Sequence, residues 1–344
     1  MKNIYPWHLK AVSELLARRD RLPHALLLSS PPGCGLSECA QELSMALLCE
    51  QPARDGSACH QCPACQWMAA GTHPDARKLS LVVGDDGKVS TQISVDAVRG
   101  LAGFLAVAGH RGGRRVVLID PAQVMNGIAA NALLKSLEEP GLGVTFLLVS
   151  ERPELLLPTI RSRCQQVGLP APDLPDAQDW LQGASGCTAE QARSLLAASG
   201  GAPLQALALA EPSIARSHAM ALQALARLPD EAVSQVADAL SALDAGIWLP
   251  LSQRWLMDVA RVAAGASPRY FPQQRERLTQ LAGRVGNPAL LTEAARGLTR
   301  QFRQISHPLN PRLYCEESLA ILSAAFASGG QRPSGGQPPG PRPG

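Results

Sequence analysis

The sequence predicts an α/β domain with a parallel sheet, followed by an all-helical region. Three short apolar segments at 24–30, 116–120 and 144–150 have the composition of strands that are buried on both faces. Stretches with apolar residues at helical spacing lie between them, as the crossovers of a parallel sheet require. Beyond about residue 169 we find no strand pattern, and Ala and Leu recur at helical spacing as far as residue 328.

The first part of the chain alternates helix and strand. Residues 7–19 predict a short amphipathic helix, and a buried strand follows at 24–30. The glycine-rich loop Pro31–Gly35 then leads into a helix whose apolar face begins at Leu36. This order of strand, glycine-rich loop and helix is typical of phosphate-binding loops.

The second half of the α/β region repeats the alternation. The strand at 116–120 is followed by a helix that spans Ala130 to Leu137 and ends before Pro140-Gly141. A third strand at 144–150 completes the pattern. Together these segments predict a sheet of parallel strands with helices on both faces.

The remainder of the chain has a different composition. A proline-rich segment at 170–180 suggests a domain boundary, and residues 175–210 predict two or three short helices that break at Gly186 and Gly200-Gly201. The last stretch, 329–344, is rich in Gly and Pro without apolar residues, so we expect it to be disordered.

Charge and aromatic content exclude several functions. The formal net charge is +3, from 32 Lys and Arg against 29 Asp and Glu, which excludes a strongly basic nucleic-acid coat. Aromatic residues make up 4% of the chain, too few for rows of base-stacking rings. We find neither a signal sequence nor an apolar stretch of about 18 residues, so we expect a cytoplasmic protein without a membrane segment.

Four of the nine cysteines form a cluster with metal-ligand spacing. Cys49, Cys59, Cys62 and Cys65 follow the pattern C-x9-C-x2-C-x2-C. Four thiolates complete a tetrahedron around zinc and leave no position for a substrate water, so the predicted zinc site is structural. The alternatives are unpaired or redox-active thiols, and His60 is a possible substitute ligand.

The phosphate-binding loop departs from the G-x4-G-K-[ST] pattern. Ser30 stands in place of the first glycine, and Leu36 stands where a lysine should reach the β- and γ-phosphates. Gly35 and Ser37 match the pattern, and Gly33 adds a further glycine within the loop. The site therefore lacks its main phosphate-binding side chain.

The strand at 116–120 shows a second departure. It ends in Asp120, as a magnesium-positioning strand should, but Pro121 stands where an acidic residue would orient the attacking water. Positioning and electrostatic stabilisation supply nearly all phosphoryl-transfer catalysis. We therefore predict no ATP hydrolysis by this chain and no functional ATP site, with residual nucleotide binding left open.

Two further motifs carry a family resemblance. Residues 131–140 read NALLKSLEEP and residues 159–164 read TIRSRC, and the four-cysteine insertion follows the loop helix. With these motifs, residues 1 to about 210 resemble the bacterial clamp-loader branch of the AAA+ family. The missing lysine and missing acidic residue make the chain similar to members that do not hydrolyse ATP.

The resemblance implies a role in replication. Such a subunit joins ATP-hydrolysing gamma/tau subunits and a delta subunit in a hetero-pentameric ring, which loads a sliding clamp onto primed DNA as part of the DNA polymerase III holoenzyme. It implies a P-loop-like AAA+ base at 1–169 with a zinc-binding insertion at 49–65. A helical lid at 170–210 and an all-α collar at 211–328 follow, and the collar joins the ring.

The resemblance also assigns a role to Arg163. In the family the Ser-Arg-Cys motif, here Ser162, Arg163 and Cys164, lies at a subunit boundary, and its arginine reaches the ATP of the neighbouring subunit. A planar, permanently charged guanidinium suits phosphate oxygens. The alternatives are that Arg163 forms an ordinary surface ion pair, or that Arg161 is the residue that reaches the phosphate.

Two other functions remain open from the residues alone. The chain could be an autonomous ATPase with an unusual loop, or a zinc-dependent DNA-binding module. The small basic turn of Arg111, Arg114 and Arg115 could approach DNA phosphates, although three arginines in a turn are more often a solvated edge.

Overall fold

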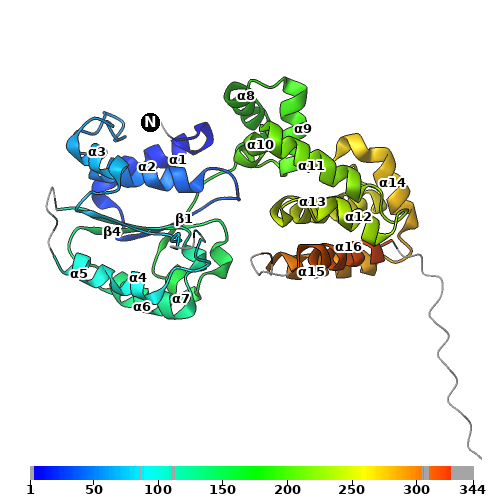
Figure 1. The fold of residues 1–344 in the computed structure, drawn as a ribbon. Coiled ribbons are helices and arrows are strands. Elements are labelled where there is room, and N and C mark those ends of the chain that lie inside the picture. Colours follow the sequence, from blue (N-terminus) through cyan, green and yellow to red (C-terminus); the bar gives the residue numbers. More distant parts are fainter. Residues whose placement is uncertain are drawn as a thin grey trace, which may run out of the picture. The chain divides into compact units, whose positions relative to one another are not determined.

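The computed structural model describes residues 4–326, apart from 85, 86, 88, 108, 110–112, 304 and 306–309 (Figure 1). The segment 329–344, which we expected to be disordered, lies outside the described residues. The chain divides into two compact units, Met1–Ala177 and Gln178–Gly344. The division falls inside the proline-rich segment 170–180, within a helix that begins at Leu174.

A five-stranded parallel sheet forms the centre of the first unit. Its order is β2-β3-β4-β1-β5, and each pair of neighbouring strands is parallel. The strands are β1 (Ala25–Ser29), β2 (Ala76–Leu79), β3 (Arg115–Ile119), β4 (Val144–Ser150) and β5 (Gln165–Gly168). The fold class predicted from the sequence, a parallel α/β domain followed by helices, is therefore confirmed.

Helices cover both faces of this sheet. In Figure 1, α1 to α3 lie on one face and α4 to α7 on the other. The helices of this unit are α1 (Leu9–Leu16), α2 (Leu36–Leu48), α3 (Pro63–Ala70), α4 (Val95–Arg99), α5 (Leu101–Ala106), α6 (Gly127–Glu138) and α7 (Pro158–Arg161), with 3-10 turns at Pro6–His8, Arg19–Arg21, Ala122–Val124 and Pro153–Leu155. Leu26 and Leu28 of β1 belong to the core under α2, whereas Leu27 belongs to the core on the opposite face. This alternation follows from the period of two along a strand.

The strand register determines which residues meet at one edge of the sheet. Ser29, the last residue of β1, pairs with Ser150, the last residue of β4. The loop after β1 and the residues after β4 therefore leave the sheet side by side, at its carboxyl edge. In open α/β sheets this edge is where ligands bind.

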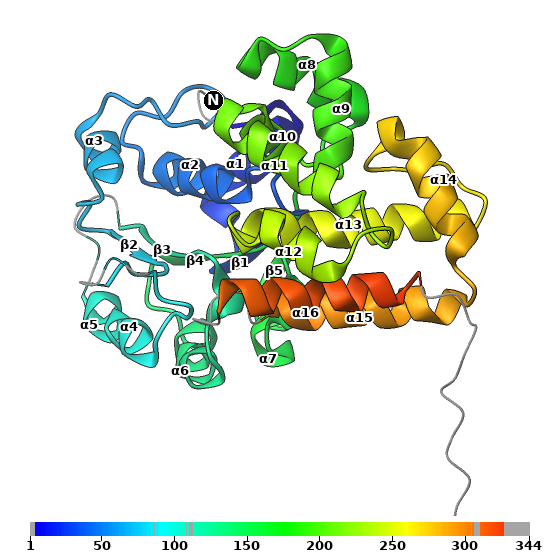
Figure 2. The same ribbon diagram turned by 45° about the vertical axis from the view of Figure 1, so that its right-hand side comes forward.

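The second unit consists of helices. Figure 2 shows α15 and α16 running side by side along this unit, and α16 also packs on α12. The bounds are α8 (Leu174–Ser185, which begins in the first unit), α9 (Ala189–Ser199), α10 (Pro203–Ala210), α11 (Pro212–Leu225), α12 (Val233–Leu240), α13 (Ala245–Ala263), α14 (Arg275–Arg284), α15 (Pro288–Arg303) and α16 (Pro311–Ala324), with a 3-10 turn at Pro272–Gln274. Trp248 and Trp255 of α13 are 1% and 0% exposed, so both rings belong to the core.

A buried aspartate organises the turn after α13. Asp258 is fully buried, and its carboxylate accepts hydrogen bonds from the backbone amides of Arg269 at 2.7 Å and of Tyr270 and Phe271 at 2.8 Å. We expect Asp258→Asn to lower the free energy of unfolding by about 2–4 kcal/mol, because the charge is lost and the amide NH₂ then faces either the Arg269 donor or the donors of Tyr270 and Phe271. Urea denaturation measures the change. Asp238→Asn, at a side chain that is 61% exposed, should cost less than about 1 kcal/mol, and equal losses would contradict the prediction.

Candidate functional site

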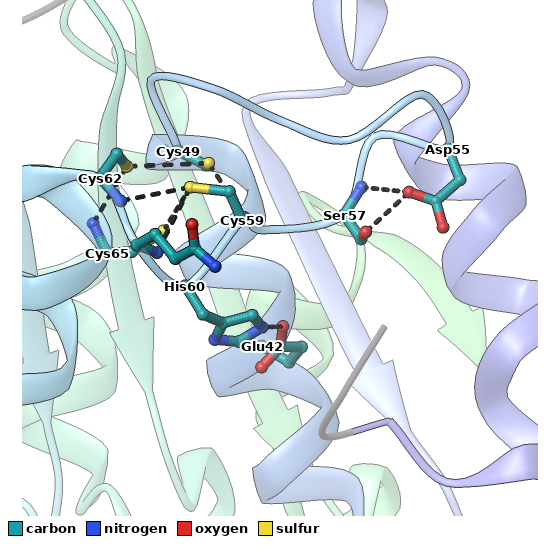
Figure 3. A network of polar contacts seen from close by, with 9 residues as sticks. Glu42, Cys49, Asp55, Ser57, Cys59, His60, Cys62 and Cys65 are labelled. Atoms are coloured by element: carbon teal, nitrogen blue, oxygen red, sulfur yellow. Dashed lines mark hydrogen bonds and ion pairs between the residues drawn. The ribbon is translucent and has the colours of Figure 1, made fainter.

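The four cysteines of the insertion come together beside α2. Cys49 directly follows this helix, and Cys62 caps the N-terminus of α3, with Cys65 in its first turn. All four Sγ atoms lie within 4.8 Å of one another, and the Cys49–Cys62 and Cys59–Cys65 pairs are each 3.9 Å apart (Figure 3). A tetrahedral site with metal–sulfur bonds of about 2.3 Å has sulfur–sulfur edges of about 3.8 Å. The group therefore has the composition and spacing to hold a metal ion.

Backbone amides point at these sulfurs. The amide of Cys59 donates to Cys49 Sγ and that of Cys62 to Cys59 Sγ, each at 3.3 Å, and Gln61 donates to Cys59 Sγ at 3.5 Å. The amides of Gln61 and Cys62 lower the pKa of the Cys59 thiol to about 6. Because metal binding requires thiolates, these donors favour the ligand form of Cys59.

His60 does not join the cluster. The group of described residues placed to hold a metal contains the four cysteines alone. The backbone at His60 has a φ of +58°, and its Nε2 lies 2.8 Å from Oε1 of Glu42, a residue of α2 that is 3% exposed (Figure 3). The imidazole therefore contacts α2, and the suggestion of His60 as a substitute ligand finds no support.

The cysteine segment shares a core with the helices of its face. Cys49, Cys62 and Cys65 pack in the same cluster as Leu36 and Leu16. A compact turn at 53–57 completes the loop, where Asp55 Oδ1 accepts from the Ser57 amide at 3.0 Å and from its hydroxyl at 2.7 Å (Figure 3). The insertion is thus an extension of the α1–α2 face of the domain.

The phosphate-binding loop keeps its backbone shape. It lies between β1 and α2, and Gly33 and Gly35 have φ of +73° and +83°, which favour glycine. The indole Nε1 of Trp7 donates to the carbonyl of Cys34 at 2.9 Å. The ring of Tyr5 covers Gly35 so closely that a Cβ at this position would lie 2.1 Å from Tyr5 Cε2. An N-terminal aromatic pair therefore packs against the loop.

The polar groups of the loop have partners within the chain. Ser37 Oγ donates to Asp120 Oδ1 at 3.0 Å, so the two side chains that would position magnesium bond to each other. Burial raises the pKa of Asp120 above its usual value. The amide of Gly33 donates to Glu151 Oε1 at 3.1 Å. Leu36, at the position of the expected lysine, is 1% exposed and belongs to the core.

Sequence reasoning did not find Glu151. The available signal was its position directly after the apolar strand at 144–150, because the carboxyl ends of parallel strands meet at one edge.

The side chain of Ser30, which stands in place of the first glycine of the motif, bonds within its own loop. It is 7% exposed and donates to the carbonyl of Pro31 at 3.1 Å.

Arg163 lies just after α7 and contacts the end of α6. Its Nη1 donates to the carbonyl of Thr159 at 3.0 Å, and its Nη2 forms an ion pair with Glu138. The Arg163 side chain is 34% exposed. Ser162 Oγ also donates to the Thr159 carbonyl, at 3.1 Å. The structure thus places Ser162 and Arg163 on one turn, with the guanidinium held by a carboxylate of the same chain.

The neighbours of Arg163 differ in exposure: Ser162 is exposed, Arg161 is half-buried and Cys164 is buried. Cys164 is buried, and burial raises the pKa of its thiol to about 11, so it remains protonated near neutral pH. The Nε of Arg161 is buried without a hydrogen-bond partner.

The basic turn points inward. Arg114 donates to the carbonyl of Arg19 at 2.8 Å, and Arg115 is 3% exposed with its guanidinium 5.5 Å from the centre of the Phe104 ring. Both side chains therefore stabilise the fold, whereas Arg111 lies outside the described residues.

Comparison with known proteins decides the family. A family model described as DNA polymerase III, delta subunit, matches residues 8–173. DNA polymerase III subunit delta' of Pseudomonas aeruginosa is 41% identical over 261 residues, which cover 75% of this chain and 76% of the relative. The chain belongs to the delta' family of DNA polymerase III subunits. The delta' subunit of Yersinia pestis is 33% identical over 345 residues, covering 95% of this chain and 97% of the relative.

The likeness extends over both units of the chain, since the Yersinia pestis match spans nearly its whole length. A solved gamma subunit-related protein of Thermotoga maritima is 18% identical, with a TM-score of 0.48, covering 93% of this chain and 99% of that protein. The family membership confirms the resemblance inferred from residues 131–140 and 159–164.

Within the described ranges, no helix combines the length and the apolar character needed to cross a membrane.

Proposed function

We propose that this chain is a non-hydrolysing subunit of the DNA polymerase III clamp loader, and that it acts through its neighbours in a hetero-pentameric ring. Its membership of the delta' family carries the proposal. The neighbours are gamma/tau and delta subunits, and the ring loads the sliding clamp onto primed DNA. Because this work takes place on the replicating chromosome, we place the protein in the cytoplasm.

The state of the phosphate loop supports the absence of ATP hydrolysis. A hydrolytic site needs a lysine on the phosphates, a magnesium-positioning pair and a group that orients water. Here Leu36 is buried, Ser37 and Asp120 are bonded to each other, and Pro121 follows the strand. The missing lysine and the missing water-orienting group support the proposal that the chain does not hydrolyse ATP.

Arg163 is the residue we propose for catalysis in trans. Its side chain is 34% exposed and stands at the ATP-facing position of the family motif, whereas the thiol of Cys164 is buried and protonated. Arg161 is half-buried like Arg163, with its Nε buried. The ion pair with Glu138 holds the Arg163 side chain in the free chain, and a neighbour's phosphate oxygens would compete for it. Ser162 flanks Arg163 and shares its carbonyl partner Thr159.

We further propose that the cysteine group holds one structural zinc ion. The set Cys49, Cys59, Cys62 and Cys65 is closed to substrate water, and four thiolates select zinc among common biological divalent ions. Bound zinc would fix the loop between α2 and α3 to the α1–α2 core.

The domain roles follow the same family assignment. We propose that 1–169 is the AAA+ base, 170–210 the lid and 211–328 the collar that joins the ring. In the second unit, Arg254 of α13 donates to the Ala198 carbonyl at 2.9 Å and to Gln205 Oε1 at 3.0 Å, which ties α9 and α10 to the helices of the proposed collar.

A reconstituted loader tests the function. Gamma/tau, delta, the sliding clamp and primed DNA of the same organism are combined with and without this chain, and clamp loading and ATP turnover are measured. We expect loading to require the chain, while the purified chain alone shows no ATP turnover. Sustained turnover by the purified chain that Asp120→Asn abolishes would overturn the proposal in favour of an autonomous ATPase. Loading that proceeds equally well without the chain would also overturn it.

A further inference from the structure

The phosphate-binding loop already holds an anionic group. At a glycine-rich loop that leads into a helix, backbone N–H groups and the helix dipole favour negative charge. The helix here is α2, with 13 residues, and Gly33 lies in the loop just before its N-terminus. Its hydrogen bond goes to the carboxylate of Glu151, at 3.1 Å. A side-chain anion of the chain itself thus takes a donor that would serve a phosphate oxygen.

The sheet register places Glu151 at this position. Ser150 ends β4 and pairs with Ser29, which ends β1, so residue 151 leaves the sheet beside residue 30. The loop and Glu151 therefore meet because of the order β4-β1 in the sheet. The contact joins residues 118 positions apart in the chain, and it depends on the fold.

The charge of Glu151 acts on both sides of the loop. After burial, Glu151 contributes to raising the pKa of the Cys34 thiol to about 11, and it also contributes to the raised pKa of Asp120. Glu38, in the first turn of α2, raises the pKa of Asp120 as well. The carboxylates of Glu38, Asp120 and Glu151 thus lie near a loop that lacks its lysine, while Lys78 and the Ser37 hydroxyl act in the opposite direction on the pKa of Asp120.

We propose that Glu151 closes the phosphate loop, excluding phosphate groups by occupying the Gly33 amide and by like-charge repulsion. This inference deepens the proposed absence of a functional ATP site, and it rests on that part of the proposed function. It assigns Glu151 a part in closing the loop beside the Tyr5 ring, which covers Gly35, and the buried Leu36. A lysine at position 36 would attract phosphate, and the buried Leu36 supplies no such charge. Glu151 adds repulsion of the phosphate.

Titration of the purified full-length chain with inorganic pyrophosphate in an isothermal titration calorimeter tests the inference. We expect Glu151→Gln and Glu151→Ala to bind pyrophosphate at least tenfold more tightly than the wild-type chain. Glu151→Ala should gain the more, because glutamine keeps an oxygen that can accept from Gly33. Glu154→Gln is the matched control, since Glu154 is an exposed carboxylate three residues further along, and it should bind as the wild type does.

Two results would overturn the inference. One is a Glu151→Ala chain that retains its thermal unfolding temperature and binds pyrophosphate no better than the wild type. The other is an equal gain in Glu154→Gln, which would reduce the effect to net charge. Glu151→Gln and Glu151→Ala should both fold, because Glu151 is exposed and has no part in the core. The clamp-loading assay does not depend on this titration, so a failure here is distinguishable from a failure of the proposed function.

Discussion

Replacing Cys62 by serine is expected to release the bound metal and to unfold the loop that precedes α3. Cys62 caps α3 and lies 3.9 Å from Cys49 through their Sγ atoms, so it joins both ends of the insertion. Structural zinc sites carry an apparent binding free energy of about 10–16 kcal/mol, and a short loop-rich segment has little apolar core to replace it. Most of that energy is lost when one of four thiolates becomes a hydroxyl, which is a poor zinc ligand.

Metal content and proteolysis measure this effect. Native mass spectrometry should find one zinc ion in the wild-type chain and none in Cys62→Ser. Trypsin should cut after Arg54, an exposed residue of the 53–57 turn, much faster in the variant than in the wild type. A chelator added to the wild-type chain should give the same fragments.

The control for this experiment is Cys187→Ser. Cys187 is a free, half-buried cysteine in the turn between α8 and α9, and it is not a member of the metal-binding group. It should keep the zinc ion and the resistance of Arg54 to trypsin. A Cys62→Ser chain that retains a full complement of zinc would disprove the assignment of Cys62 as a ligand.

Arg163→Ala should abolish the contribution of the adjacent ATP site in the assembled loader. A trans-acting arginine is worth about 10³–10⁵ in rate at the site it serves, so total turnover should fall to what the other sites supply. The stability of the isolated chain should hardly change, because the ion pair between Arg163 and Glu138 joins side chains that are 34% and 49% exposed. ATP turnover of the purified ring, with ring assembly checked by size exclusion, measures the outcome.

Two variants separate the possible explanations. Glu138→Gln removes the carboxylate that holds Arg163 in the free chain but leaves the guanidinium, so turnover should stay at or above the wild-type value. Arg161→Ala tests the competing arginine two residues earlier. Wild-type turnover in Arg163→Ala, or a loss found in Arg161→Ala alone, would show that Arg163 is not the residue that reaches the neighbour's phosphate.

The three central strands of the sheet could be predicted from the sequence, but its two edge strands could not. β1, β3 and β4 are buried along almost their whole length and therefore read as continuous apolar segments. β5 is an edge strand of sequence QQVG with mostly exposed residues, and nothing in its composition separates it from a loop. β2, at the opposite edge, reads ARKL, and its two central residues are charged and exposed, so it forms no apolar segment. Edge strands are short and polar because only one side is paired.

At the candidate sites too, residues close in sequence could be predicted, whereas contacts between distant residues could not. The cysteine group could be predicted because its four ligands lie close in sequence at fixed spacings. The contacts of Glu151 with Gly33, and of Glu138 with Arg163, join residues that only the fold brings together. The position of His60 depends on a positive φ and on a carboxylate of α2, neither of which spacing reveals.

The hydrogen bond between Ser37 and Asp120 has a consequence for the folding stability of the chain. A protein that binds a ligand only when folded gains stability as the ligand concentration rises above its dissociation constant. Here Ser37, Asp120 and the Gly33 amide have their hydrogen-bond partners within the chain and need no such ligand to satisfy them. Given the proposed absence of a nucleotide site, the folding equilibrium of this subunit would not depend on the ATP to ADP ratio of the cell.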